Sequence, residues 1–218
     1  MAGEIQTITN PIVNCYLLKT DSGFVMVDAG VSFYRGALKK SLKQAGCRPG
    51  ELKLVVITHG DYDHTGNCAY LQKNYGAKIA VHKNEAGALE RGVMLASRKT
   101  KQGIVFRMTL ALFKWLIFRK CKPDIFVGEG DDLGDYGLDG RVVHIPGHTT
   151  GSIGVLMSEG DFFCGDLLTN SGRPEKNKLV DNESEMDASI EKLKKLGVKT
   201  VYPGHGKPFK IEELVAGR

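Results

Sequence analysis

Short apolar runs alternate with longer amphipathic segments along the whole chain. Apolar runs of strand length, each followed by turn or polar residues, predict strands over 24–30, 52–60, 77–82, 141–148, 152–157, 161–166 and 199–205. Helical spacing of the apolar positions predicts helices over 32–45, 67–75, 85–95, 186–196 and 211–215. The mixture predicts an α/β protein in which helices pack in layers against sheet.

Length and composition are typical of one globular domain. The chain has 218 residues, 42% of them hydrophobic, and no repeat or low-complexity segment, so we expect 1–218 to form a single domain. The N-terminal residues do not combine a basic stretch with the apolar run of a signal peptide, so we expect a cytoplasmic location. The five cysteines form no C-x-x-C pair and are expected to be reduced and structural.

Histidines and aspartates gather at the ends of four predicted strands. The motif "THGDYDH" contains His59, Asp61, Asp63 and His64, and three later motifs supply His148, Asp166 and His205. Taken alone, a histidine beside a Pro-Gly turn is usually a hydrogen-bonded loop residue, and Asp166 could cap a helix. The first motif is different, because carboxylates and imidazoles this close in sequence are typical of a metal site. We therefore predict a metal centre on the loops at these strand ends.

In this order the motifs resemble the metallo-β-lactamase fold superfamily, whose signature is T-H-x-H-x-D-H followed by a distant His, Asp and His. The resemblance extends from Asn14 to about Pro208 and includes "NCYLL" and "VDAG" near the N-terminus. It implies a four-layer αββα sandwich with the site at one edge, and a helical insert around 85–120. It also implies two divalent metal ions, the first held by His59, Asp61 and His148, the second by Asp63, His64 and His205, with Asp166 bridging them. Asp28 of "VDAG" has no place among these ligands, and we expect it to orient the metal-binding loop.

Asp61 departs from the signature, which has a histidine at this position. The additional carboxylate makes the ligand set one unit more negative, which weakens the first metal as a Lewis acid. Oxygen ligands also favour harder ions, so iron and manganese are alternatives to the expected zinc. Flavodiiron proteins of the same superfamily carry a carboxylate here as well, but they need a fused flavin domain, for which 218 residues leave no room.

The resemblance implies a dinuclear metal-dependent hydrolase. In such an enzyme a metal-bridging hydroxide attacks an ester, thioester, lactone or phosphoester, and we expect Asp63 to orient that hydroxide or accept its proton. Two alternatives are a diiron oxidoreductase module that works with a separate flavoprotein, and a non-catalytic metal-binding regulator. His82 and His144 match no ligand position and are expected to be structural.

A basic, apolar segment interrupts the chain between Glu90 and Asp124. It contains no acidic residue and the following basic ones: Arg91, Arg98, Lys99, Lys101, Arg107, Lys114, Arg119, Lys120 and Lys122. The apolar run 104–118 is too short and too charged to span a bilayer. For 98–122 the alternatives are a core helix, a lid, a homo-oligomer contact and a peripheral contact with an anionic membrane. A lipophilic or anionic small-molecule substrate would suit such a segment, whereas nucleic acid is disfavoured because the additional motifs of the superfamily's nucleases are absent from the sequence.

Overall fold

The computed structural model describes residues 4–91 and 120–214. The predicted insert lies mostly outside the described residues, as do the end of the helix predicted over 85–95 and the proposed lid, oligomer or membrane contact around 98–119. In the two described ranges, every helix is too short or too polar to cross a bilayer.

The first sheet is built by the N-terminal half of the chain, with the strand order β1-β2-β3-β4-β5-β6. Its strands are β1 Ile5–Thr9, β2 Asn14–Thr20, β3 Gly23–Val27, β4 Leu52–Ile57, β5 Lys78–Val81 and β6 Ile125–Phe126. The first three strands are antiparallel, and β3 to β6 are parallel. The helical elements that follow β3, β4 and β5 are η1 Ser32–Tyr34, α1 Arg35–Gln44, α2 Tyr62–Thr65, α3 Cys68–Tyr75, η2 Lys83–Glu85 and α4 Ala86–Arg91.

The second sheet is built by the C-terminal half, with the strand order β12-β11-β9-β8-β7 and β10 paired to β9. Its strands are β7 Gly140–His144, β8 Ile153–Met157, β9 Asp161–Asn170, β10 Glu175–Lys176, β11 Thr200–Gly206 and β12 Phe209–Lys210. The helical elements here are η3 Gly134–Tyr136, α6 Glu183–Lys195 and η4 Ile211–Glu213. Strands β9 and β11 are parallel, but their register shifts on either side of Pro203.

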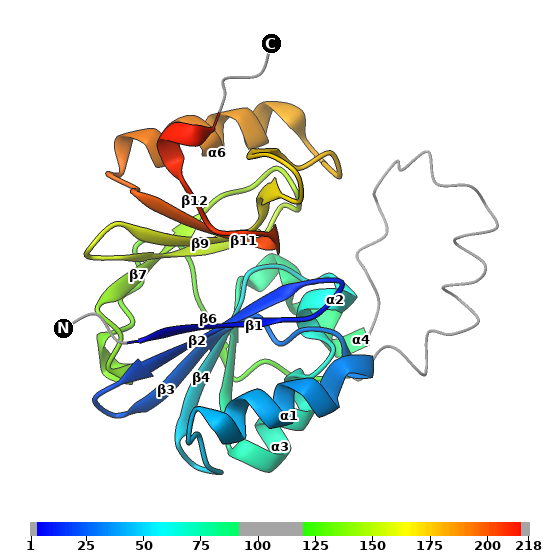
Figure 1. Cartoon of the computed structure of the whole chain (residues 1–218). Coiled ribbons are helices and arrows are strands. Elements are labelled where there is room, and N and C mark those ends of the chain that lie inside the picture. Colours follow the sequence, from blue (N-terminus) through cyan, green and yellow to red (C-terminus); the bar gives the residue numbers. More distant parts are fainter. Residues whose placement is uncertain (1–3, 92–119, 215–218) are drawn as a thin grey trace.

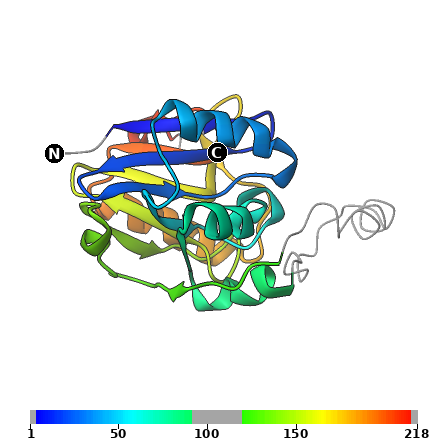
Figure 2. The same ribbon diagram turned by 90° about the horizontal axis from the view of Figure 1, so that it is seen from below.

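Three buried cores separate four layers. Successive side chains of a strand point to opposite faces, so Val25 and Val27 of β3 pack between the two sheets while Met26 packs toward α1 and α3. A third core joins the second sheet to α6 through residues such as Met186 and Leu193. Figure 1 shows the resulting order: α6, second sheet, first sheet, and then α1 with α3, whose outer faces are seen in Figure 2. The predicted αββα sandwich is confirmed.

Most predicted elements are present with shifted ends. Helix α6 begins at Glu183 and not at 186, because the Asn182 side chain caps it by accepting a hydrogen bond from the Glu185 N–H. Strand β9 continues to Asn170, well beyond its predicted end at 166. The predicted C-terminal helix is a single 3₁₀ turn in the described residues. Strands β1 and β2 were not predicted as elements, although β2 contains the "NCYLL" motif.

Candidate metal centre

The "THGDYDH" motif forms the connection between β4 and α2. Strand β4 is buried along most of its length, and the chain turns into α2 directly after Asp61. The Asp61 side chain does not cap that helix. It lies instead near two imidazoles, with Oδ2 3.5 Å from His59 Nε2 and 3.3 Å from His148 Nε2. Asp61 therefore joins the cluster at the position where the superfamily signature has a histidine.

The predicted ligands form two groups in space, and a third group of His59, His64 and Asp166 overlaps both. The first group is His59, Asp61 and His148, and the second group is Asp63, His64 and His205; within each group the candidate ligand atoms lie within 4.8 Å of one another. In the second group, Asp63 Oδ2 is 3.8 Å from His64 Nε2 and 3.5 Å from His205 Nε2. This division matches the one that the superfamily resemblance implies.

Asp166 lies between the two groups. Its Oδ1 is 3.3 Å from His64 Nε2, and its Oδ2 is 3.2 Å from His205 Nε2 and 3.7 Å from His148 Nε2. One carboxylate thus faces imidazoles of both groups, which is the arrangement that a ligand bridging two cations requires.

All four imidazoles present Nε2 to the site because each Nδ1 has another partner. These partners are Thr58 Oγ1 for His59 (3.0 Å), Asp28 Oδ2 for His64 (2.8 Å), the Leu179 carbonyl for His148 (2.6 Å) and the Ile12 carbonyl for His205 (2.6 Å). Carbonyl and carboxylate oxygens only accept, so Nδ1 donates, and in the neutral imidazole Nε2 keeps the lone pair that can bind a metal. The Thr58 hydroxyl donates to Asp28, so it accepts from His59 in the same way.

Three buried polar atoms at the centre point to a cation. Within the described part of the chain, His59 Nε2, His64 Nε2 and Asp166 Oδ1 are buried and make no hydrogen bond. Leaving one such atom without a partner costs about 1–3 kcal/mol. Bound divalent ions would remove that cost, since imidazole nitrogen and carboxylate oxygen are ligands of zinc, iron and manganese. The residues present therefore fit a dinuclear metal centre.

The charges of the centre shift the pKa of its members in different directions. Burial lowers the pKa of His59, and the neighbouring imidazoles lower it further. Burial also acts to lower the pKa of His64, but the carboxylates of Asp28 and Asp166 outweigh it and hold the pKa well above its ordinary value. Burial likewise acts to lower the pKa of His205, but the carboxylates of Asp166 and Asp63 outweigh it and raise the pKa. Burial opposes ionisation of Asp166, yet the His64 imidazole outweighs it and keeps the pKa of Asp166 well below its usual range.

Asp28 supports the motif from the end of β3, as expected from the sequence. Besides its contact with His64, it accepts hydrogen bonds from the Thr58 N–H at 2.9 Å and from the Thr58 hydroxyl. Its φ of 62° is the one positive value among the described non-glycine residues. Such a conformation is costly for a residue with a Cβ, and it persists here because three contacts hold the carboxylate in place.

The prediction that all the ligands lie on loops at strand ends is wrong for Asp166, His205 and His64. Asp166 and His205 lie inside β9 and β11, not on loops after them, and Asp166 caps no helix. His64 likewise lies in α2. Asp166 and His205 still reach the centre because the β9 and β11 pairing is irregular there, with Gly165 at φ 51° and register shifts beside Pro203. The local departure from a regular ladder turns both side chains toward the same space.

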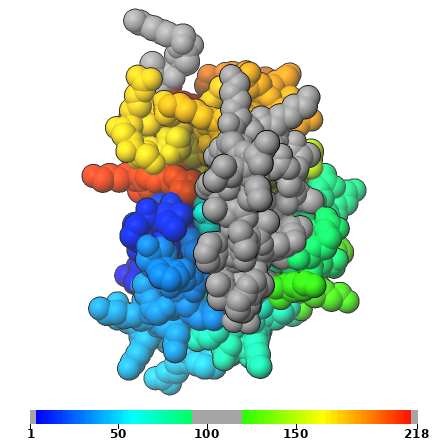
Figure 3. All heavy atoms as spheres, turned by 90° about the vertical axis from the view of Figure 1, so that its right-hand side faces the viewer, coloured from blue at the N-terminus to red at the C-terminus, as the bar shows by residue number. Residues whose placement is uncertain are grey.

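Several supporting residues were missed by the sequence analysis. The Asn14 side chain donates to the Pro203 and Gly206 carbonyls at 3.1 and 2.6 Å, and the Tyr16 hydroxyl donates to the Pro203 carbonyl at 2.6 Å. These bonds tie β2 to the end of β11, and Figure 3 shows that orange-red end between the blue N-terminal strands and the yellow segment. The Asn177 side chain donates to Asp166 at 3.2 Å. The "NCYLL" motif was the available signal for Asn14 and Tyr16; nothing local marked Asn177.

His82 and His144 lie apart from the candidate ligands. Their rings stack on each other at 4.6 Å with an angle of 11° between the planes. Neither belongs to the possible metal-holding groups found in the described ranges.

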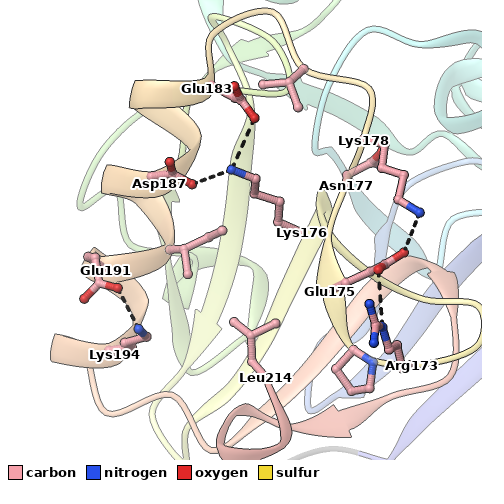
Figure 4. A pocket seen from close by; sticks show the side chains of 13 residues that line it. Arg173, Glu175, Lys176, Asn177, Lys178, Glu183, Asp187, Glu191, Lys194 and Leu214 are labelled. Atoms are coloured by element: carbon pink, nitrogen blue, oxygen red, sulfur yellow. Dashed lines mark hydrogen bonds and ion pairs between the residues drawn. The ribbon is translucent and has the colours of Figure 1, made fainter. Parts of the chain in front are cut away.

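A groove of about 870 Å³ lies between residues 173–180 and α6, and none of the candidate ligands lines it. Figure 4 shows that its charged side chains pair with one another. The pairs are Lys176 with Glu183 and Asp187, Glu175 with Arg173 and Lys178, and Lys194 with Glu191. Because these charges are already paired, the groove offers no unbalanced charge to a ligand.

Comparison with known proteins places the chain in a family. The family model described as the metallo-beta-lactamase superfamily matches residues 8–205. The fold agrees: a solved B3 metallo-beta-lactamase, BLEG-1, superposes with a TM-score of 0.75 over 96% of this chain and 95% of its own, at 22% identity. The protein TTHA1623, solved in a di-iron-bound form, gives a TM-score of 0.70 with the same coverage at 24% identity. This chain therefore belongs to the metallo-β-lactamase superfamily.

Curated relatives include hydrolases of more than one description. The acyl-coenzyme A thioesterase MBLAC2 of Bos taurus is 28% identical over 222 residues, which cover 92% of this chain and 75% of the relative. The hydroxyacylglutathione hydrolase of Pelagibacter ubique is 28% identical over 157 residues, covering 71% and 52%. A beta-lactamase-like protein 2 homolog of Drosophila melanogaster is 26% identical, and the match covers 88% of this chain but 58% of that protein. Several relatives are thus considerably longer than the region they share with this chain.

Proposed function

We propose that this protein is a dinuclear metal-dependent hydrolase whose substrates are thioesters. The observation that carries the proposal is the convergence of four imidazole Nε2 atoms and three carboxylates, with buried atoms at its centre that make no hydrogen bond within the described residues. When bound, two divalent ions would polarise the substrate carbonyl and make water a stronger nucleophile at neutral pH. No serine or cysteine nucleophile is then needed.

The chain's own residues have separate roles in this proposal. Both groups and Asp166 would hold the ions. The first group, His64 and Asp166 are buried, whereas the Asp63 side chain is 14% exposed and the His205 side chain 25% exposed. Substrate therefore approaches from the side of Asp63 and His205. We assign to Asp63 the proton of the attacking water, which it accepts on a carboxylate oxygen and later returns to the leaving thiolate. Water thus adds to the carbonyl carbon as the carbon–sulfur bond breaks, giving a carboxylic acid and a thiol.

The choice of thioesters is supported by the relatives. One is named as an acyl-coenzyme A thioesterase and another as a hydroxyacylglutathione hydrolase, and in both substrates an acyl group is joined to sulfur. Esters, lactones and phosphoesters would meet the same metal centre, so they belong in the test. The carboxylate of Asp61 and the di-iron neighbour favour iron as the alternative to zinc in this site.

The experiment begins with elemental analysis of protein purified without added metal, followed by assays on acyl-coenzyme A, acylglutathione, lactone, phosphodiester and β-lactam substrates. We expect about two ions per chain and the highest kcat/KM on a thioester. The Asp63→Asn variant keeps an amide oxygen for the metal but no carboxylate that can accept a proton, so it should bind one ion more weakly and lose turnover; Asp135→Asn, at an exposed position in η3, is the control that keeps both ions and turnover. Two ions without hydrolysis of any substrate would favour a metal-binding regulator, and iron that cycles between oxidation states would favour the diiron oxidoreductase.

A further inference from the structure

Glu85 is a fully buried carboxylate that belongs to neither candidate ligand group. It ends η2, immediately after β5, and its exposed fraction is 0%. Both of its oxygens accept hydrogen bonds from backbone: Oε2 from the Gly60 N–H at 2.8 Å and Oε1 from the Gly151 N–H at 3.0 Å. Hydrogen bonds to a carboxylate are roughly twice as strong as neutral ones. One side chain thus ties together two loops that are far apart in the sequence.

These two loops supply the whole first group. Gly60 is the residue between His59 and Asp61, so its peptide connects two candidate ligands directly. Gly151 follows His148 by three residues in the loop that leads into β8. The second group is held differently, through the contacts of its imidazoles with Asp28 and with the Ile12 carbonyl.

Residues 60 and 151 are glycines because there is no space for a side chain, and not because the backbone needs the conformational freedom of glycine. A Cβ on Gly60 would lie 2.7 Å from Glu85 Oε2 and 2.6 Å from the Ala88 Cβ, and a Cβ on Gly151 would lie 2.5 Å from Glu85 Oε1. Neither glycine has a positive φ, so a turn conformation does not explain them. The chain leaves room on both loops for the same carboxylate.

We propose that Glu85 is a positioning residue for the first metal group. By holding the Gly60 and Gly151 peptides on its two oxygens, it sets the spacing of His59 and Asp61 relative to His148 without touching the cation itself. Residues that orient metal ligands typically change metal affinity by roughly 10–100-fold when they are lost. The inference rests on the candidate metal centre and does not depend on thioesters being the substrate.

The test is Glu85→Gln, with Glu90→Gln as the matched control on the exposed side of α4. Glutamine keeps the volume, but its NH₂ group cannot accept a hydrogen bond from one of the two peptides. Zinc and cobalt are titrated into metal-free protein against a chelator, and the visible spectrum of bound cobalt is recorded. We expect one of the two ions to bind roughly 10–100-fold more weakly with an altered cobalt spectrum, the other to stay within about threefold, and Glu90→Gln to match the unmodified protein.

A second variant keeps the proposal testable if Glu85→Gln does not fold. Gly151→Ala displaces the carboxylate from one loop only and should cause the same selective loss, whereas Gly172→Ala, where a Cβ meets no atom within 4 Å, should not. A lower melting temperature with both affinities and the cobalt spectrum unchanged would mean that Glu85 only stabilises the fold. Equal weakening of both ions would also overturn the proposal. Selective weakening in a protein that hydrolyses no thioester would leave the positioning role intact and refute only the proposed substrate.

Discussion

The two candidate ligand groups share a bridging carboxylate but differ in how the fold surrounds them. The first group is buried throughout, with His59 1% and His148 0% exposed, and a single buried carboxylate joins its two loops. In the second group His64 is equally buried, but the His205 side chain is 25% exposed. Under the proposed function, the enclosed first group anchors a metal ion and the second group lies on the side from which substrate approaches. Variants in the two groups should therefore separate metal binding from folding.

The largest expected effect is that of His64→Ala. His64 faces carboxylates on both sides, and its removal leaves Asp28 buried without an imidazole partner. Breaking a buried pair in this way costs about 3–5 kcal/mol. We expect the metal-free variant to lose that much unfolding free energy in a denaturant titration. With metal added, the variant should bind only one ion, and its turnover should fall by more than about 100-fold, which is more than the loss of a residue that merely supports a ligand causes.

The control for His64→Ala is Asp135→Ala, which removes an exposed side chain of η3 and should leave metal content and turnover unchanged. Two tightly bound ions per chain in His64→Ala would exclude His64 as a ligand. Unchanged unfolding free energy would instead show that the pair with Asp28 contributes nothing to the fold.

His205→Ala should impair metal binding and turnover with little loss of stability, whereas His64→Ala should impair all three. The His205 imidazole is partly exposed, and the loss of its hydrogen bond to the Ile12 carbonyl should cost only about 1 kcal/mol of unfolding free energy. The second ion and nearly all turnover should still be lost. Denaturation of the metal-free protein, set beside elemental analysis, measures both quantities. A stability loss as large as that of His64→Ala would contradict the smaller contribution to folding that the partial exposure of His205 predicts.

Asp61 tests the first group. Asp61→Ala should weaken one ion by tenfold or more, since it removes the carboxylate that lies within 3.5 Å of two imidazoles. Asp61→His should restore zinc binding and move the basic side of the activity profile to lower pH, because the site regains one positive charge. Asp135→Ala, an exposed aspartate in η3, is the control. Unchanged metal content in Asp61→Ala would make this residue a bystander.

The layers and the set of candidate ligands could be predicted from the sequence. Apolar strands such as β4 are buried on both faces, so their runs stand out, and the "THGDYDH" motif concentrates its donors in a few residues. The predicted strands over 161–166 and 199–205 end on Asp166 and His205, but the directions in which these two side chains point could not be predicted. They depend on a register shift between β9 and β11, which is a property of paired strands and leaves no mark on either run alone.

Glu85 was missed for a related reason. In the sequence it is the first residue of a predicted helix, where an acidic side chain is normally exposed and favoured by the helix dipole. Its two partners are backbone groups of Gly60 and Gly151, brought together only by the packing of the two sheets. Asp28 was easier, because the "VDAG" motif suggested its role before its contact with His64 was known. Contacts made through backbone groups of distant segments cannot be predicted from sequence patterns, because nearly every residue type offers the same backbone groups.

The smallest expected effect is a difference in pH dependence between the two groups. Neighbouring carboxylates raise the pKa of His64 and His205, so in the metal-free protein these imidazoles hold protons at pH values above 6.5, the ordinary pKa of histidine. Metal binding must displace those protons, and affinity for the second ion should therefore fall, by up to about tenfold per pH unit per proton, as the pH decreases from above 6.5. Burial lowers the pKa of His59, so protons should compete with the metal for this imidazole only at lower pH.

The raised pKa of His64 also stabilises the metal-free fold below pH 6.5, and that stability should be lost as the pH rises through the raised pKa. Zinc titrations from pH 5.5 to 8.5, with denaturation of the metal-free protein at the same pH values, measure both trends. If the affinities for the two ions depended equally on pH, the predicted electrostatic difference between the two groups would be wrong.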